Sequence, residues 1–184
     1  HEAALAYQSK ADWLETLGEQ SNHEEIMKLY EYTRYLLSIV CSKEATITHY
    51  KNFALVHSRI AARYMQNESD ESVEKALEYY GAAEEILREM VNQYPVKETR
   101  LSLARVLRRI GNVYVDRGSD TFLHKAITYY EEAYEILQNT FEDKYEPECI
   151  DEMIDMHSCL GFAYSACNEQ MYLKKSFEHY EKGY

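Results

Sequence analysis

The sequence predicts an all-α fold, an α-solenoid of antiparallel helix pairs, and three observations point to it. Only two prolines and six glycines interrupt the 184 residues, too few for a β sandwich with its many turns. Apolar residues recur at three- and four-residue spacing, which is the helical period, and nowhere alternate by two as in a strand. The pattern also returns at a fixed interval, as it does in repeat proteins.

The interval is clearest at four tyrosines, Tyr30, Tyr80, Tyr130 and Tyr180, which stand 50 residues apart (80 − 30 = 50). A second set keeps the same step, with a small residue followed three positions later by a larger one: Ala11, Ala61, Gly111 and Gly161, then Leu14, Tyr64, Tyr114 and Tyr164. Each repeat therefore holds two helices. We expect the small residue to let the second helix approach closely, and the larger side chain to fill the space beside that contact.

The chain divides in order into four expected hairpins, over about residues 1–44, 45–95, 96–145 and 146–184, the last one truncated. Within the third hairpin, Gly118 suits the position just after a helix, and Ser119 or Asp120 suits the N-cap of the next. Pro95 and Pro147 separate hairpins, because proline ends one helix and is tolerated in the first turn of another. The chain begins at His1 and stops at Tyr184 inside a helical pattern, so we expect a fragment of a longer protein.

The repeats resemble the tetratricopeptide family, whose first helix carries a bulky residue, Leu-Gly and Tyr, and whose second carries Ala, an aromatic residue and Ala. The matching residues in the third repeat are Leu107, Ile110, Gly111, Tyr114, Ala126, Tyr130 and Ala133. The resemblance covers essentially the whole chain and implies a right-handed superhelix of helix pairs. The first repeat matches least, and every repeat is longer than the family's unit of about 34 residues, which predicts longer helices.

Composition narrows the class of partner and the location. With 20 basic and 32 acidic residues the net charge is −12, which repels nucleic acid phosphates and anionic lipid headgroups. No apolar stretch approaches the roughly 20 residues that span a bilayer. The four cysteines show no CxxC spacing, which favours a reduced, cytoplasmic setting. We therefore expect a protein or peptide partner, and neither nucleic acid nor membrane.

The resemblance implies a concave groove lined by the first helix of each repeat. At the corresponding positions the second repeat has Leu55, Ser58, Ala62 and Met65, the third has Arg105, Arg108, Asn112 and Asp116, and the fourth has Asp155, Ser158 and Phe162. These residues are the candidate peptide-binding site.

The third repeat carries an unusual local charge. Residues 97–118 hold six Lys or Arg against two acidic residues, an excess of 6 − 2 = +4 in an acidic chain. Guanidinium groups pair bidentately with carboxylate or phosphate, so one hypothesis is an acidic, C-terminal or phosphorylated segment lying across Arg105, Arg108 and Asn112. Met65 and Phe162 would then take apolar side chains. The other hypothesis, equally open, is that the arginines form ion pairs between repeats with the acidic second helices, at Glu74, Glu78, Glu84, Glu85 and Glu89.

Catalysis and metal binding are not expected. His57 and His157 stand at equivalent positions where the family has a bulky packing residue, and no HExxH or paired CxxC motif is present. The sequence thus predicts a non-catalytic binding scaffold without a cofactor. Two alternatives remain open: a structural module that self-associates through the uncapped last repeat, at Phe177 and Tyr180, and a peptide-responsive regulatory sensor.

Overall fold

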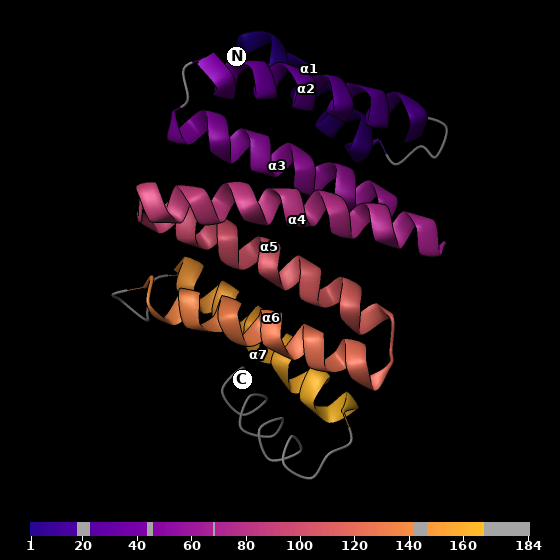
Figure 1. Ribbon diagram of the computed structural model, residues 1–184, viewed down its shortest axis with the longest axis vertical. Coiled ribbons are helices and arrows are strands. Elements are labelled where there is room, and N and C mark those ends of the chain that lie inside the picture. The colour runs from indigo at the N-terminus through magenta and orange to yellow at the C-terminus, as the bar shows by residue number, and fades with distance from the viewer. Residues whose placement is uncertain (18–22, 44–45, 68, 142–146, 168–184) are drawn as a thin grey trace. The chain divides into compact units, whose positions relative to one another are not determined.

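The computed structural model describes residues 1–17, 23–43, 46–67, 69–141 and 147–167, and within these ranges every regular element is an α-helix. The all-α prediction is therefore confirmed. The helices, drawn in Figure 1, are α1 (Glu2–Thr16), α2 (His23–Lys43), α3 (Ile47–Tyr64), α4 (Asp70–Gln93), α5 (Lys97–Asp116), α6 (Asp120–Gln138) and α7 (Pro147–Ala166).

Helices that follow one another in the chain pack as pairs. α1 packs on α2, α3 on α4 and α5 on α6, while α2 also contacts α3 and α6 also contacts α7. The chain forms two compact units, residues 1–94 and 95–184, and the division falls between the second and third expected hairpins. The second helix of the fourth hairpin, with Phe177 and Tyr180, lies outside the described residues.

The turn between α5 and α6 follows the sequence prediction closely. Gly118 adopts a φ of 68°, the left-handed conformation that glycine reaches without strain, directly after the C-cap Arg117. Ser119 is the N-cap of α6, and its hydroxyl accepts a hydrogen bond from the backbone N–H of Phe122 at 3.4 Å. The α5 helix thus ends, and the chain reverses direction, at the residues where the sequence predicts a turn.

The contact between α5 and α6 depends on the absence of a side chain at Gly111. A Cβ placed there would lie 2.7 Å from Cδ1 of Tyr130, closer than van der Waals contact allows. The Tyr130 ring, itself fully buried, therefore lies against the bare backbone of α5. Tyr114, three residues after the glycine, stacks on Phe122 and Tyr129 of α6 with centroids 5.9 and 5.8 Å away. The predicted roles of the small and large positions are confirmed in this repeat.

Candidate binding surface

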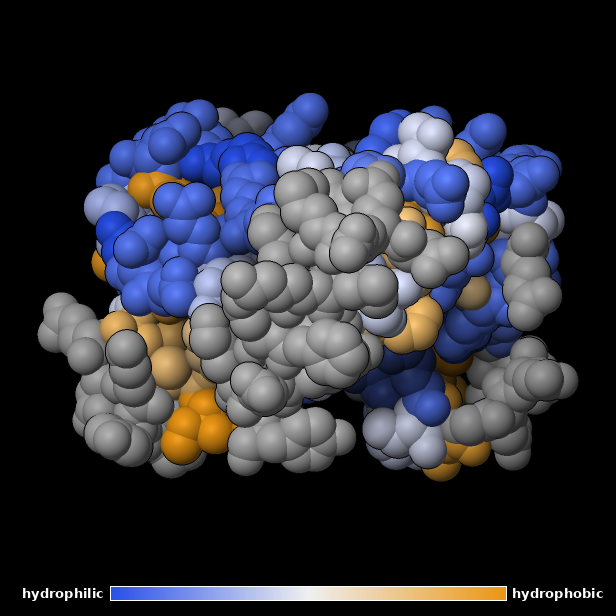
Figure 2. Space-filling model, turned by 90° about the horizontal axis from the view of Figure 1, so that it is seen from below, coloured by the Kyte–Doolittle hydropathy of each residue, from blue (hydrophilic) through white to orange (hydrophobic). Residues whose placement is uncertain are grey.

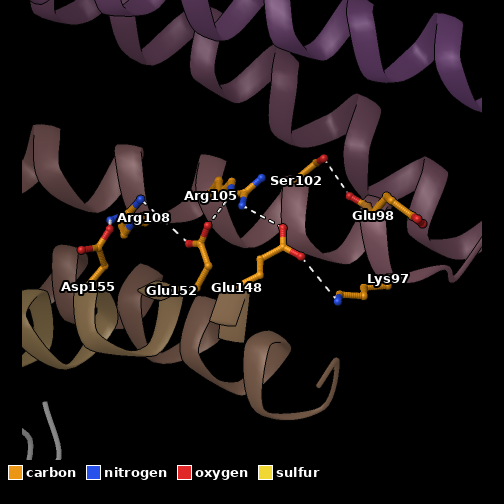
Figure 3. A network of polar contacts seen from close by, with 8 residues as sticks. All are labelled: Lys97, Glu98, Ser102, Arg105, Arg108, Glu148, Glu152 and Asp155. Carbon is orange, nitrogen blue, oxygen red and sulfur yellow. Dashed lines mark hydrogen bonds and ion pairs between the residues drawn. The ribbon is translucent and has the colours of Figure 1, made fainter. Parts of the chain in front are cut away.

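Arg105 and Arg108 lie one turn apart on α5 and face a matching row of carboxylates on α7. Those carboxylates, Glu148, Glu152 and Asp155, follow one another at four- and three-residue spacing, so they share one face of their helix. Figure 3 shows the two rows meeting, with the guanidinium groups of α5 directed at the carboxylates of α7. The ion pairs therefore join the first helices of two consecutive repeats.

Glu152 is the centre of this network because it is the buried member. Its Oε1 accepts a hydrogen bond from Nε of Arg105 at 2.5 Å, and its Oε2 lies 4.0 Å from Nη2 of Arg108. Arg105 also donates from Nη2 to Glu148 at 3.3 Å, and Arg108 donates to Asp155. A buried carboxylate is stable as an anion only with such partners, so the arginines have a structural role within the chain.

The second sequence hypothesis, ion pairing between repeats, thus describes these two arginines, but it named the wrong partners. The acids it named belong to second helices, and one of them, Glu84, pairs within α4 with Arg88 at 2.8 Å. The actual partners belong to the next first helix. The signal was present in the sequence as the i, i+4, i+7 spacing of acids in residues 148–155, which was not weighed against the arginine row.

Asn112 is likewise engaged within the chain. Its Oδ1 accepts a hydrogen bond from the hydroxyl of Tyr130 at 2.6 Å, and Sγ of Cys159 lies 3.9 Å away. Burial raises the pKa of the Tyr130 hydroxyl well above its usual range, helped by Cys159 and Asp116, so it remains a donor. Asp116, farther along α5, is exposed, and partial burial raises the pKa of its carboxyl group.

The candidate residues of the second repeat lie in the other unit, on or just after α3, and they differ in exposure. Leu55 is exposed, and Ala62 and Met65 are half-buried. Ser58 does not line a surface, contrary to expectation: it is buried, and its hydroxyl donates to the carbonyl of Ala54 at 3.1 Å. A serine inside a helix commonly satisfies its hydroxyl in this way when no solvent is near.

A second row of ion pairs, which the sequence analysis missed, joins α1 and α3 in the first unit. Arg59 lies 3.7 Å from both Asp12 and Glu15, and Arg63 lies 4.0 Å from Glu15. Here the acids stand on the earlier helix and the bases on the later one, the reverse of α5 and α7. The sequence does carry a signal for this row. The two acids of α1 are three residues apart, the two arginines of α3 are four apart, and both pairs lie in the C-terminal half of a first helix.

The surface of α7 beyond the ion pairs is exposed. Ser158 and Ser165 are exposed, and Phe162 presents 53% of its surface to solvent. An aromatic ring left this open on a rigid helix is an available apolar contact. Among the residues that are coloured in Figure 2, most on this side are hydrophilic, and hydrophobic residues gather in separate areas.

A cavity of about 550 Å³ opens between α6 and α7, and the sequence did not predict it. Its walls are mainly apolar, with His157 and Gln138 as polar members. The lining residues are Tyr134, Leu137, Gln138, Phe141, Cys149, Ile150, Met153, Ile154 and His157. The cavity could take an apolar side chain of a partner.

The two histidines pack as the sequence predicted. His57 is buried, with ring centroids of Phe53 at 4.8 Å and Tyr79 at 5.7 Å, and His157 is buried against Tyr134 at 5.2 Å. Among the described residues, no group of three His, Cys, Asp or Glu side chains is placed to hold a metal ion. None of the helices that the structure describes is both long and apolar enough to cross a membrane.

Comparisons with known proteins agree on the fold class. No family model matches the chain, and no curated protein matches it. A solved structure titled "DHF58 filament" is similar with a TM-score of 0.65 at 13% identity, over 98% of this chain and 90% of its own. A "DHF79 filament" is similar at 0.62 and 15%, over 98% and 97%. The de novo designed helical repeat protein DHR64 is similar at 0.52 and 14%, over 99% and 88%. The chain is therefore a helical-repeat protein built from packed helix pairs.

Proposed function

We propose that the chain is a non-catalytic scaffold that binds a protein or peptide segment along the first helices of its repeats, as the tetratricopeptide resemblance implies. The observation that carries the proposal is the α5–α7 face. There, Phe162 stands more than half exposed on a helix that the ion pairs hold against its neighbour. Rigid helices that present a fixed apolar anchor among polar groups are suited to recognising an extended or helical segment.

The charge on this face decides which segments fit. An acidic or phosphorylated segment would approach Arg105 and Arg108 in competition with Glu148, Glu152 and Asp155, which already engage them. A phosphate competes better than a carboxylate because it carries more charge and a third acceptor oxygen. Recognition through an apolar anchor at Phe162 needs no such exchange. We therefore expect the apolar contact to contribute more than the arginines.

The test is fluorescence anisotropy with a panel of short labelled peptides of four kinds: acidic, phosphoserine-containing, basic, and uncharged with aliphatic anchors. Phe162→Ala removes the anchor and copies Ala62, the equivalent residue of the second repeat, so the helix tolerates it. Val96→Ala, at an exposed apolar residue outside the cavity and away from Phe162, is the matched control. Binding that Phe162→Ala abolishes and Val96→Ala leaves intact supports the proposal.

Two results would overturn the proposal: no peptide class binds, or binding is indifferent to Phe162→Ala. Arg108→Glu separates the two kinds of ligand. If phosphoserine peptides bind and lose affinity on Arg108→Glu while uncharged peptides do not bind at all, recognition is electrostatic and the apolar anchor is wrong.

A further inference from the structure

Two histidines lie at the junction where α2 packs on α3, and each of them faces an arginine of the other helix. His23 is the first residue of α2, and its Nδ1 lies 2.8 Å from Nη2 of Arg63 on α3. His57 lies on α3 and is buried, and the charge of Arg34 on α2 acts on it. This junction joins the first hairpin to the second within the unit of residues 1–94 (Figure 1).

The hydrogen bond between Arg63 and His23 exists only while the histidine is neutral. A guanidinium group carries hydrogen on every nitrogen and cannot accept a hydrogen bond, so Arg63 is the donor. Nδ1 of His23 is then the acceptor, which places the ring hydrogen on Nε2. A protonated imidazole has no lone pair to offer, and it would set a second positive charge beside the buried Arg63. Acid therefore removes this contact.

The other charged groups around this pair do not replace it. From α1, Oε1 of Glu15 lies 4.0 Å from Nη1 of Arg63, which is beyond hydrogen-bond distance. Nε of Arg63 is buried and has no acceptor among the described residues. Protonation of His23 thus leaves a buried guanidinium group with too few partners. The two acids next to His23 on α2 are already paired with lysines: Glu24 with Lys28 at 2.6 Å, and Glu25 with Lys10 of α1 at 2.8 Å.

The surroundings of His57 also oppose a positive charge. Its Nδ1 is closed off from solvent and has no hydrogen-bond partner among the described residues. The acid that faces it from α2, Glu31, is engaged at both oxygens, because Tyr79 of α4 donates to Oε1 and Arg34 donates to Oε2 at 2.8 Å. A proton on His57 would create a buried cation near Arg34. Burial, and then Arg34, accordingly lower its pKa to about 4, against the opposing effect of Glu31.

Helix packing does not require these polar residues. The fourth repeat keeps a histidine, His157, at the position of His57, but it has no counterpart of the bond between His23 and Arg63. The titratable pair is therefore particular to the junction of α2 with α3. Elsewhere in the repeats the equivalent positions carry buried apolar residues: Leu123 for His23, Ala163 for Arg63 and Leu107 for His57.

We propose that the α2–α3 junction is an acid-sensitive switch, closed while His23 and His57 are neutral and loosened when they are protonated beside the arginines. The stability that neutral His57 gives the junction is complete above pH 6.5 and is lost as the pH falls to about 4. Within that window His57 alone should raise the population of the loosened state by up to about tenfold per pH unit. Loosening uncovers the core that the two helices share: Ile26, Leu29, Val56 and Ile60.

Hydrogen exchange followed by mass spectrometry tests the switch in the 184-residue chain. Protection factors correct for the pH dependence of the exchange reaction itself. Between about pH 7.5 and pH 5, the protection factors of peptides from α2 and α3 should fall by at least about tenfold. Peptides from α5 and α6, which belong to the other unit, are the internal control and should keep theirs. Protection of α2 and α3 that stays constant over this range overturns the proposal.

A triple variant that copies the apolar residues of the other repeats should lose the switch. It combines His23→Leu, Arg63→Ala and His57→Leu, and circular dichroism establishes that it is folded. His124→Gln, at an exposed histidine of α6, is the matched control and should leave the fall in protection unchanged. An equal fall in the triple variant and in the unsubstituted chain would show that other groups cause it.

Nuclear magnetic resonance of the unsubstituted chain decides the question even if the triple variant does not fold. The imidazole signals report at which pH each histidine takes up its proton. His23 and His57 should do so over the interval in which α2 and α3 lose protection. If both rings are protonated while the two helices remain fully protected, the arginines tolerate the added charge and the proposal is wrong.

Discussion

Tyr130 donates its hydroxyl hydrogen to Oδ1 of Asn112 at 2.6 Å, which ties α6 to α5 beside the bare backbone of Gly111. The first repeat makes the same bond one hundred residues earlier, from Tyr30 to Oδ1 of Asp12, also at 2.6 Å. Burial raises the pKa of both hydroxyls well above the usual range, so each stays a donor. In the first and third repeats, a side-chain oxygen at this position of the first helix is thus the partner of the repeated tyrosine.

Asn112→Ala should therefore destabilise the fold by about 1 kcal/mol, because the Tyr130 hydroxyl loses its acceptor. Asn112→Asp copies the first repeat and should cost far less. Urea denaturation followed by circular dichroism measures both. A double-mutant cycle with Tyr130→Phe should show that the two losses are not additive. Equal costs for the alanine and aspartate variants would contradict this role of the bond.

Gly111→Ala should destabilise the chain, whereas Gly81→Ala should stabilise it. Both residues lie inside helices, where alanine is favoured over glycine by about 1 kcal/mol. A Cβ at position 81 meets nothing within 4 Å, but one at position 111 meets the buried Tyr130 ring. Overpacking of that kind costs about 1–3 kcal/mol and outweighs the helix preference. The midpoints of urea denaturation should move in opposite directions, and a shift in the same direction would show that the ring retreats freely.

Arg105→Met should cost more stability than Lys28→Met, because Lys28 loses one exposed ion pair and Arg105 loses two, one of them with the buried Glu152. The Lys28–Glu24 pair lies in solvent and contributes at most about 0.5 kcal/mol. Loss of Arg105 leaves the buried carboxylate of Glu152 with too few partners, which costs about 1–3 kcal/mol. The double variant Arg105→Met with Glu152→Met should recover most of that loss. Thermal denaturation of the four proteins distinguishes these outcomes.

His57 should make the chain less stable as pH falls from about 6.5 towards 4. Burial, and then the nearby charge of Arg34, lower its pKa to about 4, against the opposing effect of Glu31. In the unfolded chain the imidazole takes up its proton near pH 6.5, so between these values the unfolded state binds more protons. The stability that the neutral His57 side chain contributes is therefore complete above pH 6.5, and it is lost as the pH falls to about 4.

His57→Leu is the matching control, because Leu107 occupies the equivalent position of the third repeat and is fully buried. The free energy of unfolding, measured by urea denaturation at a series of pH values, should depend less on pH in this variant. The difference in slope should approach 1.4 kcal/mol per pH unit within the window. Parallel curves for the two proteins would show that His57 is not neutral in the folded state.

The fold was largely predictable because the features that determine it are local or periodic. Gly118 and Ser119 specify their turn through backbone and side-chain chemistry within a few residues. The small position at Gly111 and the ring at Tyr130 reveal their contact by repeating together every 50 residues. Such signals need no knowledge of distant neighbours.

The candidate site was less predictable because it depends on which faces meet. The net charge of residues 97–118 pointed to an acidic ligand, but the carboxylates that engage Arg105 and Arg108 lie about forty residues later on α7 (148 − 105 = 43; 155 − 108 = 47). The prediction that Ser58 lines the groove came from a family whose repeats are shorter. In α3 the side chain at that position is buried. The cavity between α6 and α7 depends on how the two helices pack, and comparing equivalent positions of the repeats does not reveal it.

The two rows of ion pairs have opposite polarity, and this gives the repeats an order. Asp12 and Glu15 of α1 meet the arginines of α3, whereas Arg105 and Arg108 of α5 meet the acids of α7. The helices share one hydrophobic pattern, so the core alone would let a folding chain pair the wrong ones. If α1 docked where α5 belongs, acids would face acids, and if α3 received α5, arginines would face arginines. Charge thus favours the native pairing of these first helices over a swapped one, by a margin that salt should reduce.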